Sequence, residues 1–142
     1  MNDQAEVSMP GDKAQQLLET VSQWQNTTTI ILHGGSVFEF KGVFPPGKLA
    51  HGFYNLKGES GFEGHLNLEK VKHIKFQSKL HRGQESHAFV FIDHDNECIF
   101  KIFLGRDDKG TLHPSQKEQY LAYQQQYQAL NSTQKEETTN EK

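Results

Sequence analysis

Between Thr27 and Asp107 the chain alternates apolar and polar residues in short runs that are rich in β-branched and aromatic side chains. Such alternation is typical of β-strands that bury one face. Short polar turns join the runs, and short connections favour antiparallel pairing because parallel pairs need long crossovers. We therefore predict about seven antiparallel strands, at residues 27–33, 36–42, 53–58, 62–70, 71–79, 86–93 and 98–105.

Glycine and proline mark two of the connections between these strands. Gly34 and Gly35 separate the first two runs and predict a tight hairpin. Residues 44–52 contain the sequence Pro45-Pro46-Gly47. Because proline cannot donate to a strand ladder, we expect residues 44–52 to form a loop.

Apolar residues at helical spacing flank the strands on both sides. Asp12 can cap a first helix, which should end near residues 25–26. Its apolar positions are Leu17, Leu18, Val21 and Trp24. A capping-box pattern over residues 115–118, with Pro114 just ahead, predicts the start of a second helix. The apolar stripe of this second helix is Tyr120, Tyr123, Tyr127 and Leu130.

Helices at both ends of an antiparallel meander indicate an α+β fold with flanking helices. The length predicts a single domain over residues 1–130, in which residues 1–8 are polar and expected to be loose. Residues 131–142 are polar and of low complexity, and we expect a disordered tail there. Hydrophobic residues make up only 34% of the chain, which suggests a sheet covered on one side.

Charge and cysteine content exclude several classes of protein. The formal net charge of −3 argues against nucleic-acid binding, which needs a basic surface. A single cysteine, Cys98, excludes an internal disulfide and zinc-finger spacing. We see no secretory signal and no apolar run near the ~18 residues of a membrane span, so we expect a cytoplasmic protein without a membrane span.

Two enzyme classes are excluded by their missing motifs. His33-Gly34-Gly35 follows a strand, as the oxyanion motif of α/β-hydrolases does, but the nucleophile elbow of that fold is absent. The glycine-rich motifs that bind nucleotide phosphates are absent too.

The run at residues 62–70 carries one unusual residue, His65. Leu66 and Leu68 share one face of this strand, whereas His65 points to the other because side chains alternate. Gly64 leaves the opposite face without a side chain next to His65. The residues alone leave two interpretations open: a solvated surface histidine, or a ligand to a metal-bearing planar cofactor.

Several other residues also have a structural and a functional interpretation. Tyr54 either packs in the core or faces a ligand, and His33 ends its strand at a turn. Lys101 should emerge on the face opposite the apolar residues of its strand, with Arg106 at the strand end. The two cations either lie in a solvated turn or bind carboxylates, which arginine recognises with paired hydrogen bonds. We interpret the remaining histidines without visible partners as surface or structural residues: His73, His81, His87, His94 and His113.

Five blocks of the sequence together resemble the intracellular haem-utilisation carriers of the ChuX/HutX type. The blocks are residues 23–40, 44–58, 61–69, 82–92 and 100–112, in familiar order and spacing. The resemblance implies a cytoplasmic protein whose cargo is haem b. It also implies a homodimer, and a fold similar to one half of the two-repeat haem-degrading proteins.

The resemblance implies His65 as the axial haem ligand, because it matches the histidine of the family's Gly-His-Leu block. Leu32 stands where some members carry a second histidine, and a shift of one residue would turn His33 to the other face of its strand. The wider candidates are His33, His51 and Tyr54 for a second ligand or pocket wall, and Lys101, Arg106 and Arg82 for the propionates.

The leading hypothesis is a haem carrier and buffer that receives imported haem and passes it to a degrading enzyme for iron acquisition. The alternative is reductant-dependent haem degradation, although no flavin or nicotinamide motif is present to supply electrons. A second alternative is an interaction module that binds no haem and docks a partner through its tyrosine-bearing helix.

Overall fold

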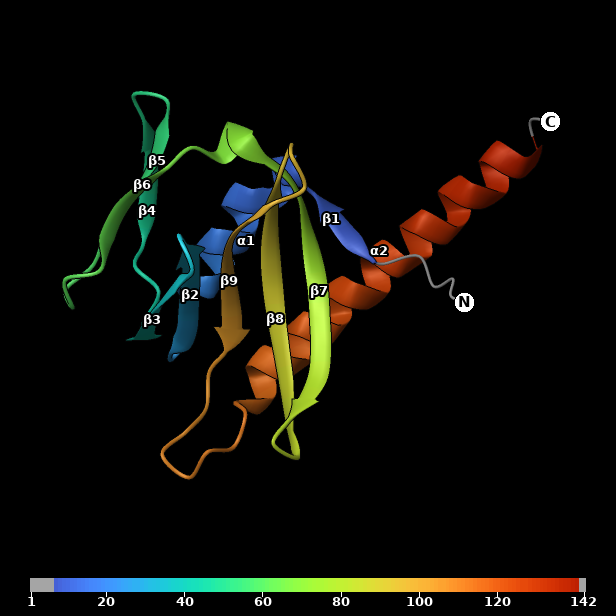
Figure 1. Cartoon of the computed structure of the whole chain (residues 1–142). Helices are drawn as coiled ribbons and strands as arrows, with labels where there is room; N and C mark the ends of the chain where they lie inside the picture. The colour runs from blue at the N-terminus through green and yellow to red at the C-terminus, as the bar shows by residue number, and fades with distance from the viewer. Residues whose placement is uncertain (1–6, 141–142) are drawn as a thin grey trace.

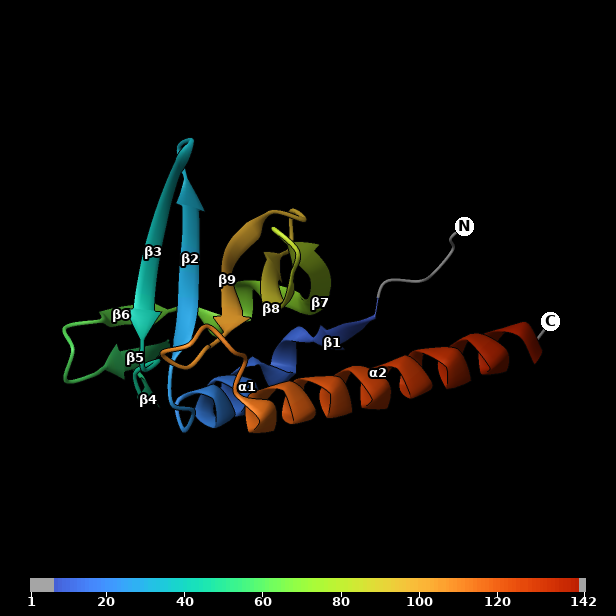
Figure 2. The same cartoon turned by 90° about the horizontal axis from the view of Figure 1, so that it is seen from below.

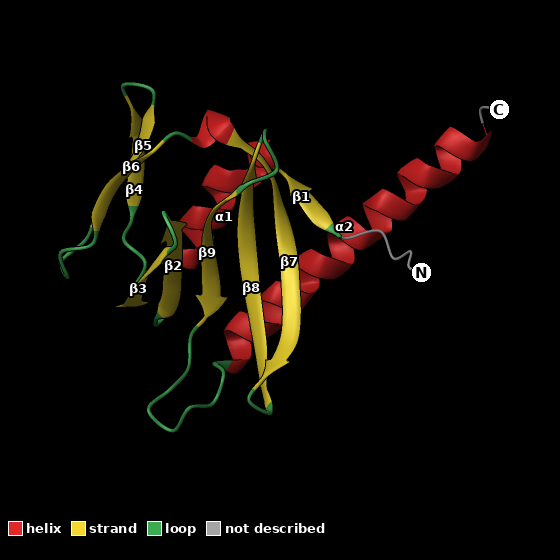
Figure 3. Cartoon of the chain, in the orientation of Figure 1, coloured by secondary structure: helices red, strands yellow, loops and turns green. Residues whose placement is uncertain are grey.

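The structure, a computed structural model, describes residues 7–140 of the chain, with side chains described for residues 7–130. Its strands are β1 (Ser8–Pro10), β2 (Thr27–His33), β3 (Ser36–Gly42), β4 (Gly47–Ala50), β5 (Phe53–Lys57), β6 (Glu63–Leu66), β7 (Val71–His81), β8 (Gln84–Asp93) and β9 (Cys98–Leu104). Its helices are the 3₁₀ turns η1 (Gly11–Lys13) and η2 (Leu68–Lys70) and the α-helices α1 (Ala14–Val21) and α2 (Pro114–Asn140) (Figures 1 and 3). The predicted α+β class with flanking helices is confirmed.

The strands form two antiparallel sheets rather than the single meander expected from the sequence. The larger sheet has the order β1-β7-β8-β9-β2-β3, and the smaller one the order β4-β5-β6. β9 returns to pair with β2, with Phe100 opposite Ile31. His65 on β6 and Lys101 on β9 therefore belong to different sheets.

Both α-helices lie on one side of the larger sheet, and α2 runs across its back and projects past β1 (Figures 1 and 2). On this side Phe89 of β8 is completely buried between Trp24 and Tyr120, with ring centroids 6.3 Å and 5.0 Å away. Burial of each large apolar side chain stabilises the fold by about 1.5–3 kcal/mol. The hairpin of β2 and β3 points away from the helices in Figure 2, and neither α-helix lies against the other face of the larger sheet.

The first hairpin is confirmed and the predicted loop after it is partly wrong. β2 and β3 have the predicted bounds, and Gly34 and Gly35 adopt φ angles of 59° and 76° in the turn between them. Within residues 44–52, however, Gly47–Ala50 form β4 at the edge of the smaller sheet. Proline precedes this strand rather than interrupting it, which an edge strand tolerates.

The first helix is shorter than predicted. α1 ends at Val21, and the Trp24 N–H donates to the Val21 carbonyl in a following turn. Asp12 lies in η1 and makes no capping bond, because Lys13 occupies the N-cap position of α1. Trp24 is nevertheless buried, as its helical spacing suggested.

The run predicted as a strand over residues 62–70 is divided in two. β6 ends at Leu66, and the Asn67 side chain then accepts the Glu69 N–H and starts η2. Asparagine favours such local side-chain bonds over a strand ladder. The apolar residues Leu66 and Leu68 still pack against the core, as expected.

The elements at the two ends of the chain reach into the segments that were expected to be loose. Ser8 pairs with Lys75 in the larger sheet, while residues 1–6 lie outside the described residues. The tail expected at residues 131–142 overlaps the end of α2, whose side chains beyond Leu130 also lie outside them. Leu130 is 47% exposed, so the apolar stripe of α2 ends at Tyr127. Across the described part of the chain, no helix is both long and apolar enough to cross a membrane.

Candidate functional site

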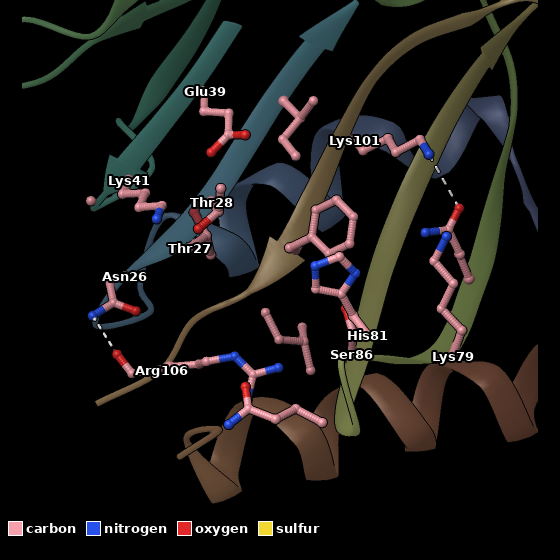
Figure 4. A pocket seen from close by; sticks show the side chains of 16 residues that line it. Asn26, Thr27, Thr28, Glu39, Lys41, Lys79, His81, Ser86, Lys101 and Arg106 are labelled. Atoms are coloured by element: carbon pink, nitrogen blue, oxygen red, sulfur yellow. Dashed lines mark hydrogen bonds between the residues drawn. The ribbon is translucent and has the colours of Figure 1, made fainter. Parts of the chain in front are cut away.

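His65 lines one hollow of the structure, and Lys101 and Arg106 together line another. The first, here called the β6 hollow, has a volume of about 530 Å³, and its lining includes His65, Leu66, Leu68, His94, Ile99 and Phe100. The second, here called the basic hollow, has a volume of about 660 Å³, and its lining includes Lys41, Lys79, His81, Lys101, Phe103 and Arg106 (Figure 4).

His65 stands exposed on the outer face of β6, while Leu66 turns inward and is half-buried. This orientation was predicted from strand alternation. Asn55 of β5 lies directly opposite His65, and the Asn55 Oδ1 atom is 2.6 Å from the His65 Nδ1 atom. The ring of Phe53 meets the imidazole edge-on at a centroid distance of 6.4 Å. Two side chains of β5 therefore hold the ring of His65.

The β6 hollow has an apolar wall and a polar rim, and the rim includes Lys70, Asp93 and Asp95. Leu66 and Leu68 come from the segment around β6, whereas Ile99 and Phe100 come from β9 of the larger sheet. A hollow with this apolar wall and an imidazole at its edge can accept a flat apolar ligand that carries a metal.

His94 also lines the β6 hollow, although its sequence context gave no sign of a partner. It belongs to the turn between β8 and β9, and its Nε2 atom lies 3.0 Å from the Glu69 carbonyl oxygen. A carbonyl can only accept, so Nε2 donates its hydrogen there. The contact depends on how the two sheets meet, which local sequence patterns do not reveal.

The basic hollow lies on the face of the larger sheet opposite the helices. Figure 4 shows Lys41 from β3, Lys79 and His81 from β7, and Lys101 from β9 around it. Glu39 supplies a carboxylate to the same lining. The excess of cations favours a ligand that carries carboxylates.

The two predicted cations of this hollow differ in their bonding. Lys101 emerges opposite the buried Phe100 and Ile102, as predicted, and its Nζ atom donates to Gln77 Oε1 at 3.3 Å. Arg106 donates from Nη1 to the Gly110 carbonyl at 3.1 Å and from Nη2 to the Glu85 carbonyl. The Arg106 guanidinium thus ties together two segments of the protein itself.

The other candidates occupy separate places. His33 is exposed at the end of β2, and Arg82 is exposed in the turn between β7 and β8 with a φ angle of 54°. His51 lies in the turn between β4 and β5 with a φ angle of 56°. It lines a third hollow of about 570 Å³, which shares His94 with the β6 hollow.

Neither Tyr54 nor Cys98 offers an anionic ligand at neutral pH. Tyr54 is 1% exposed, and burial raises the pKa of its hydroxyl. Its core-packing interpretation is therefore the one that fits. Burial also raises the pKa of the Cys98 thiol, and metals bind the thiolate form.

His87, which the sequence left as surface or structural, is a buried structural residue. Its Nδ1 atom lies 2.8 Å from Ser78 Oγ, and its Nε2 atom lies 2.6 Å from Glu85 Oε2. Glu85 also pairs with Lys117 of α2 at 2.9 Å. This network joins the hairpin of β7 and β8 to α2.

The structure places His65 in one hollow and Lys101 with Arg106 in another. The two hollows follow one another along β9, because Ile99 lines the first and Lys101 lines the second. Lys101 lies about 7 Å along an extended strand from Ile99, which is the extra residue of a β-bulge between β8 and β9. An extended ligand in the β6 hollow could thus reach toward Lys101.

The model of the haem-utilisation family ChuX/HutX matches residues 7–125 of the chain. The chain belongs to this family. A relative, the intracellular haem transport protein HutX of Vibrio cholerae serotype O1, is 47% identical over 118 residues. The match covers 82% of this chain and 61% of HutX, so the chain spans less than two thirds of that relative's length.

Solved structures agree with this assignment. The crystal structure of ChuX superposes with a TM-score of 0.79 at 30% identity, over 89% of this chain and 79% of ChuX. The haem-degrading enzyme ChuS of Escherichia coli O157:H7 has a TM-score of 0.72 at 18% identity, over 87% of this chain and 37% of ChuS. The likeness to ChuS concerns the fold alone, and it confirms that this fold corresponds to one part of a longer haem-degrading protein.

Proposed function

We propose that this chain is a cytoplasmic carrier and buffer of haem, which receives imported haem and passes it to a degrading enzyme for iron acquisition. Its membership of the ChuX/HutX family supports the proposal, as does the name of its relative HutX, a haem transport protein. The observation that carries it is the exposed imidazole of His65 at a hollow of about 530 Å³ that has an apolar wall of Leu66, Leu68, Ile99 and Phe100. That volume lies within the usual ~300–1,000 Å³ of small-molecule sites.

In this proposal His65 is the axial ligand of the haem iron, and the macrocycle lies against the lining of the β6 hollow beside it. Lys101 is the preferred partner for a propionate, because among the described residues its ammonium group donates to one neutral side chain, Gln77. Arg106 already donates to two backbone carbonyls, which makes it a weaker candidate. One firm axial ligand suits a carrier that must release its cargo.

The test is a titration of the purified chain with ferric haem, followed by the Soret band, beside His65→Ala. We expect a saturable shift near one haem per chain, and its loss or alteration in the variant. His33→Ala and His51→Ala are the matched controls. His33 is exposed at the end of β2, His51 is exposed in the β4–β5 turn, and neither lines the β6 hollow. Unchanged binding in His65→Ala would move the ligand to another residue, and no binding in the wild type would overturn the proposal.

The proposal includes a homodimer. The exposed apolar side chains of the β2–β3 hairpin support a second subunit there, since Val37 and Phe38 are 57% and 58% exposed. Sedimentation at tens of micromolar should give about twice the chain mass of 16.2 kDa. A mass equal to that of one chain would overturn the dimer without affecting the haem site of a single chain.

A further inference from the structure

The amide of Asn55 has one orientation, because three carbonyl oxygens surround its nitrogen. Asn55 Nδ2 lies 3.2 Å from the Lys48 oxygen and 3.1 Å from the oxygens of Ala50 and Phe53. Carbonyl oxygens only accept, so the amide NH₂ must face them. The Asn55 Oδ1 atom is thereby left facing the His65 ring, 2.6 Å from Nδ1.

The orientation of this amide decides where His65 carries its proton. Because the Asn55 Oδ1 atom only accepts, the His65 Nδ1 atom must be the donor in the contact between them. A neutral imidazole has one N–H group, so its other nitrogen, Nε2, holds the lone pair. A metal binds this lone pair, and the hydrogen bond of the opposite nitrogen selects which one is available.

We propose that Asn55 is the positioning residue of the haem site, which holds His65 in the Nδ1–H tautomer and presents Nε2 to the iron. This inference rests on the proposed function of His65 as the axial ligand. The cross-strand pairing of Asn55 with His65 and the edge-on ring of Phe53 fix the direction of the imidazole at the same time. A neutral amide also polarises the imidazole less than a carboxylate would, which suits release of the cargo.

The first part of the test needs no haem. Nitrogen NMR of the ¹⁵N-labelled apo chain reports the protonated nitrogen of each neutral imidazole. We expect the Nδ1–H tautomer for His65 in the wild type and in Asn55→Asp, whose carboxylate keeps an acceptor oxygen. In Asn55→Ala we expect His65 to shift toward the Nε2–H tautomer. A wild-type His65 in the Nε2–H form would overturn the inference.

The second part measures affinity for ferric haem in the same variants. Loss of an outer-shell partner usually weakens metal binding by about 10- to 100-fold, and we expect this loss in Asn55→Ala. Asn55→Asp also loses the amide donor to Lys48, Ala50 and Phe53 but keeps the acceptor, and it should retain binding. Equal weakening in both variants would mean that Asn55 acts only through the β4–β5 turn, and would overturn the positioning role.

A failure of the proposed function would be seen separately. If His65→Ala bound haem as the wild type does, His65 would not be the ligand, and Asn55 could not position one. The tautomer measured in the apo chain would be unaffected by that result. The two experiments therefore report on Asn55 and on His65 independently.

Discussion

Gly47 lies directly against the ring of Tyr54. A Cβ atom at position 47 would stand only 2.4 Å from two ring atoms of Tyr54. Tyr54 is buried in the core, and it pairs across the strands with Leu66 of β6. The absence of a side chain at Gly47 thus lets β4 approach β5, which in turn pairs with the strand that carries His65.

We expect Gly47→Ala to destabilise the fold, because the Tyr54 ring must leave its packed position. Overpacking of a core typically costs about 1–3 kcal/mol, and the loss should appear as a lower midpoint in urea unfolding. Gly64→Ala is the matched control in the same sheet, since its Cβ would meet nothing closer than 3.9 Å, at Leu56. Similar effects of both substitutions would contradict the role assigned to Gly47.

The same contact explains why part of the smaller sheet was missed in the sequence. The bounds of β2 and β3 were predicted correctly because alternation and the Gly34–Gly35 turn are local signals. Pro45-Pro46-Gly47 is an equally local signal, and it favours a turn. β4 forms all the same, because an edge strand needs hydrogen bonds on one side only and Tyr54 supplies the packing.

The candidate site, too, could be predicted from the sequence only where local patterns determine it. The exposure of His65 followed from alternation along one strand, so it could be predicted. Its separation from Lys101 depends on β9 pairing with β2 and on a second sheet, which are long-range features. The partnership of Asn55 with His65 depends on the register of the β5–β6 hairpin, which sequence patterns leave undetermined when the turn is several residues long.

Alanine substitutions of Arg106 and Lys101 should change different properties. Arg106→Ala should affect the stability of the fold, and Lys101→Ala the affinity for haem. Arg106→Ala removes the donor to the Gly110 and Glu85 carbonyls, and bonds from a charged donor are worth about 1.5–3 kcal/mol. We therefore expect a clear loss of unfolding free energy in Arg106→Ala and little change in Lys101→Ala. Haem titration should show weaker binding in Lys101→Ala and little change in Arg106→Ala. The Soret position of Lys101→Ala should be unchanged, because the axial ligand is intact. A shifted Soret band would mean that Lys101 has another role.

Glu85 should contribute to the acid sensitivity of the fold. Hydrogen bonds from His87 and then Lys117 lower the pKa of Glu85 below its usual 4.5. Its stabilisation is therefore present above pH 4.5 and is lost as the pH falls through the lower pKa of the folded state. Glu85→Gln should lower the unfolding free energy by less than about 1 kcal/mol at neutral pH, because the pair of Glu85 and Lys117 is partly exposed. Below pH 4.5 the unfolding free energy of Glu85→Gln should also fall less steeply than that of the wild type.

Tyr120 should control the alkaline limit of stability. Its hydroxyl is buried within 3.3 Å of Ser78 Oγ and the carbonyls of Gln77 and Ala88, and burial raises its pKa from 10.0 to about 12. Because the folded state favours the neutral hydroxyl, the stabilisation is complete below pH 10 and is lost as the pH rises through about 12.

Tyr120→Phe tests this role. The loss of the bonded hydroxyl should cost about 1–2 kcal/mol at neutral pH. The fall in unfolding free energy of the variant above pH 10 should be smaller than in the wild type. Some fall should remain, because burial also raises the pKa of Tyr54 and Tyr127. Tyr123→Phe is the control, since that hydroxyl meets only Thr20 Oγ1 among the described hydrogen bonds. An equal fall in the unfolding free energy of Tyr120→Phe and of the wild type above pH 10 would contradict this role. That result would show that ionisation of Tyr120 does not open the contact between α2 and the sheet.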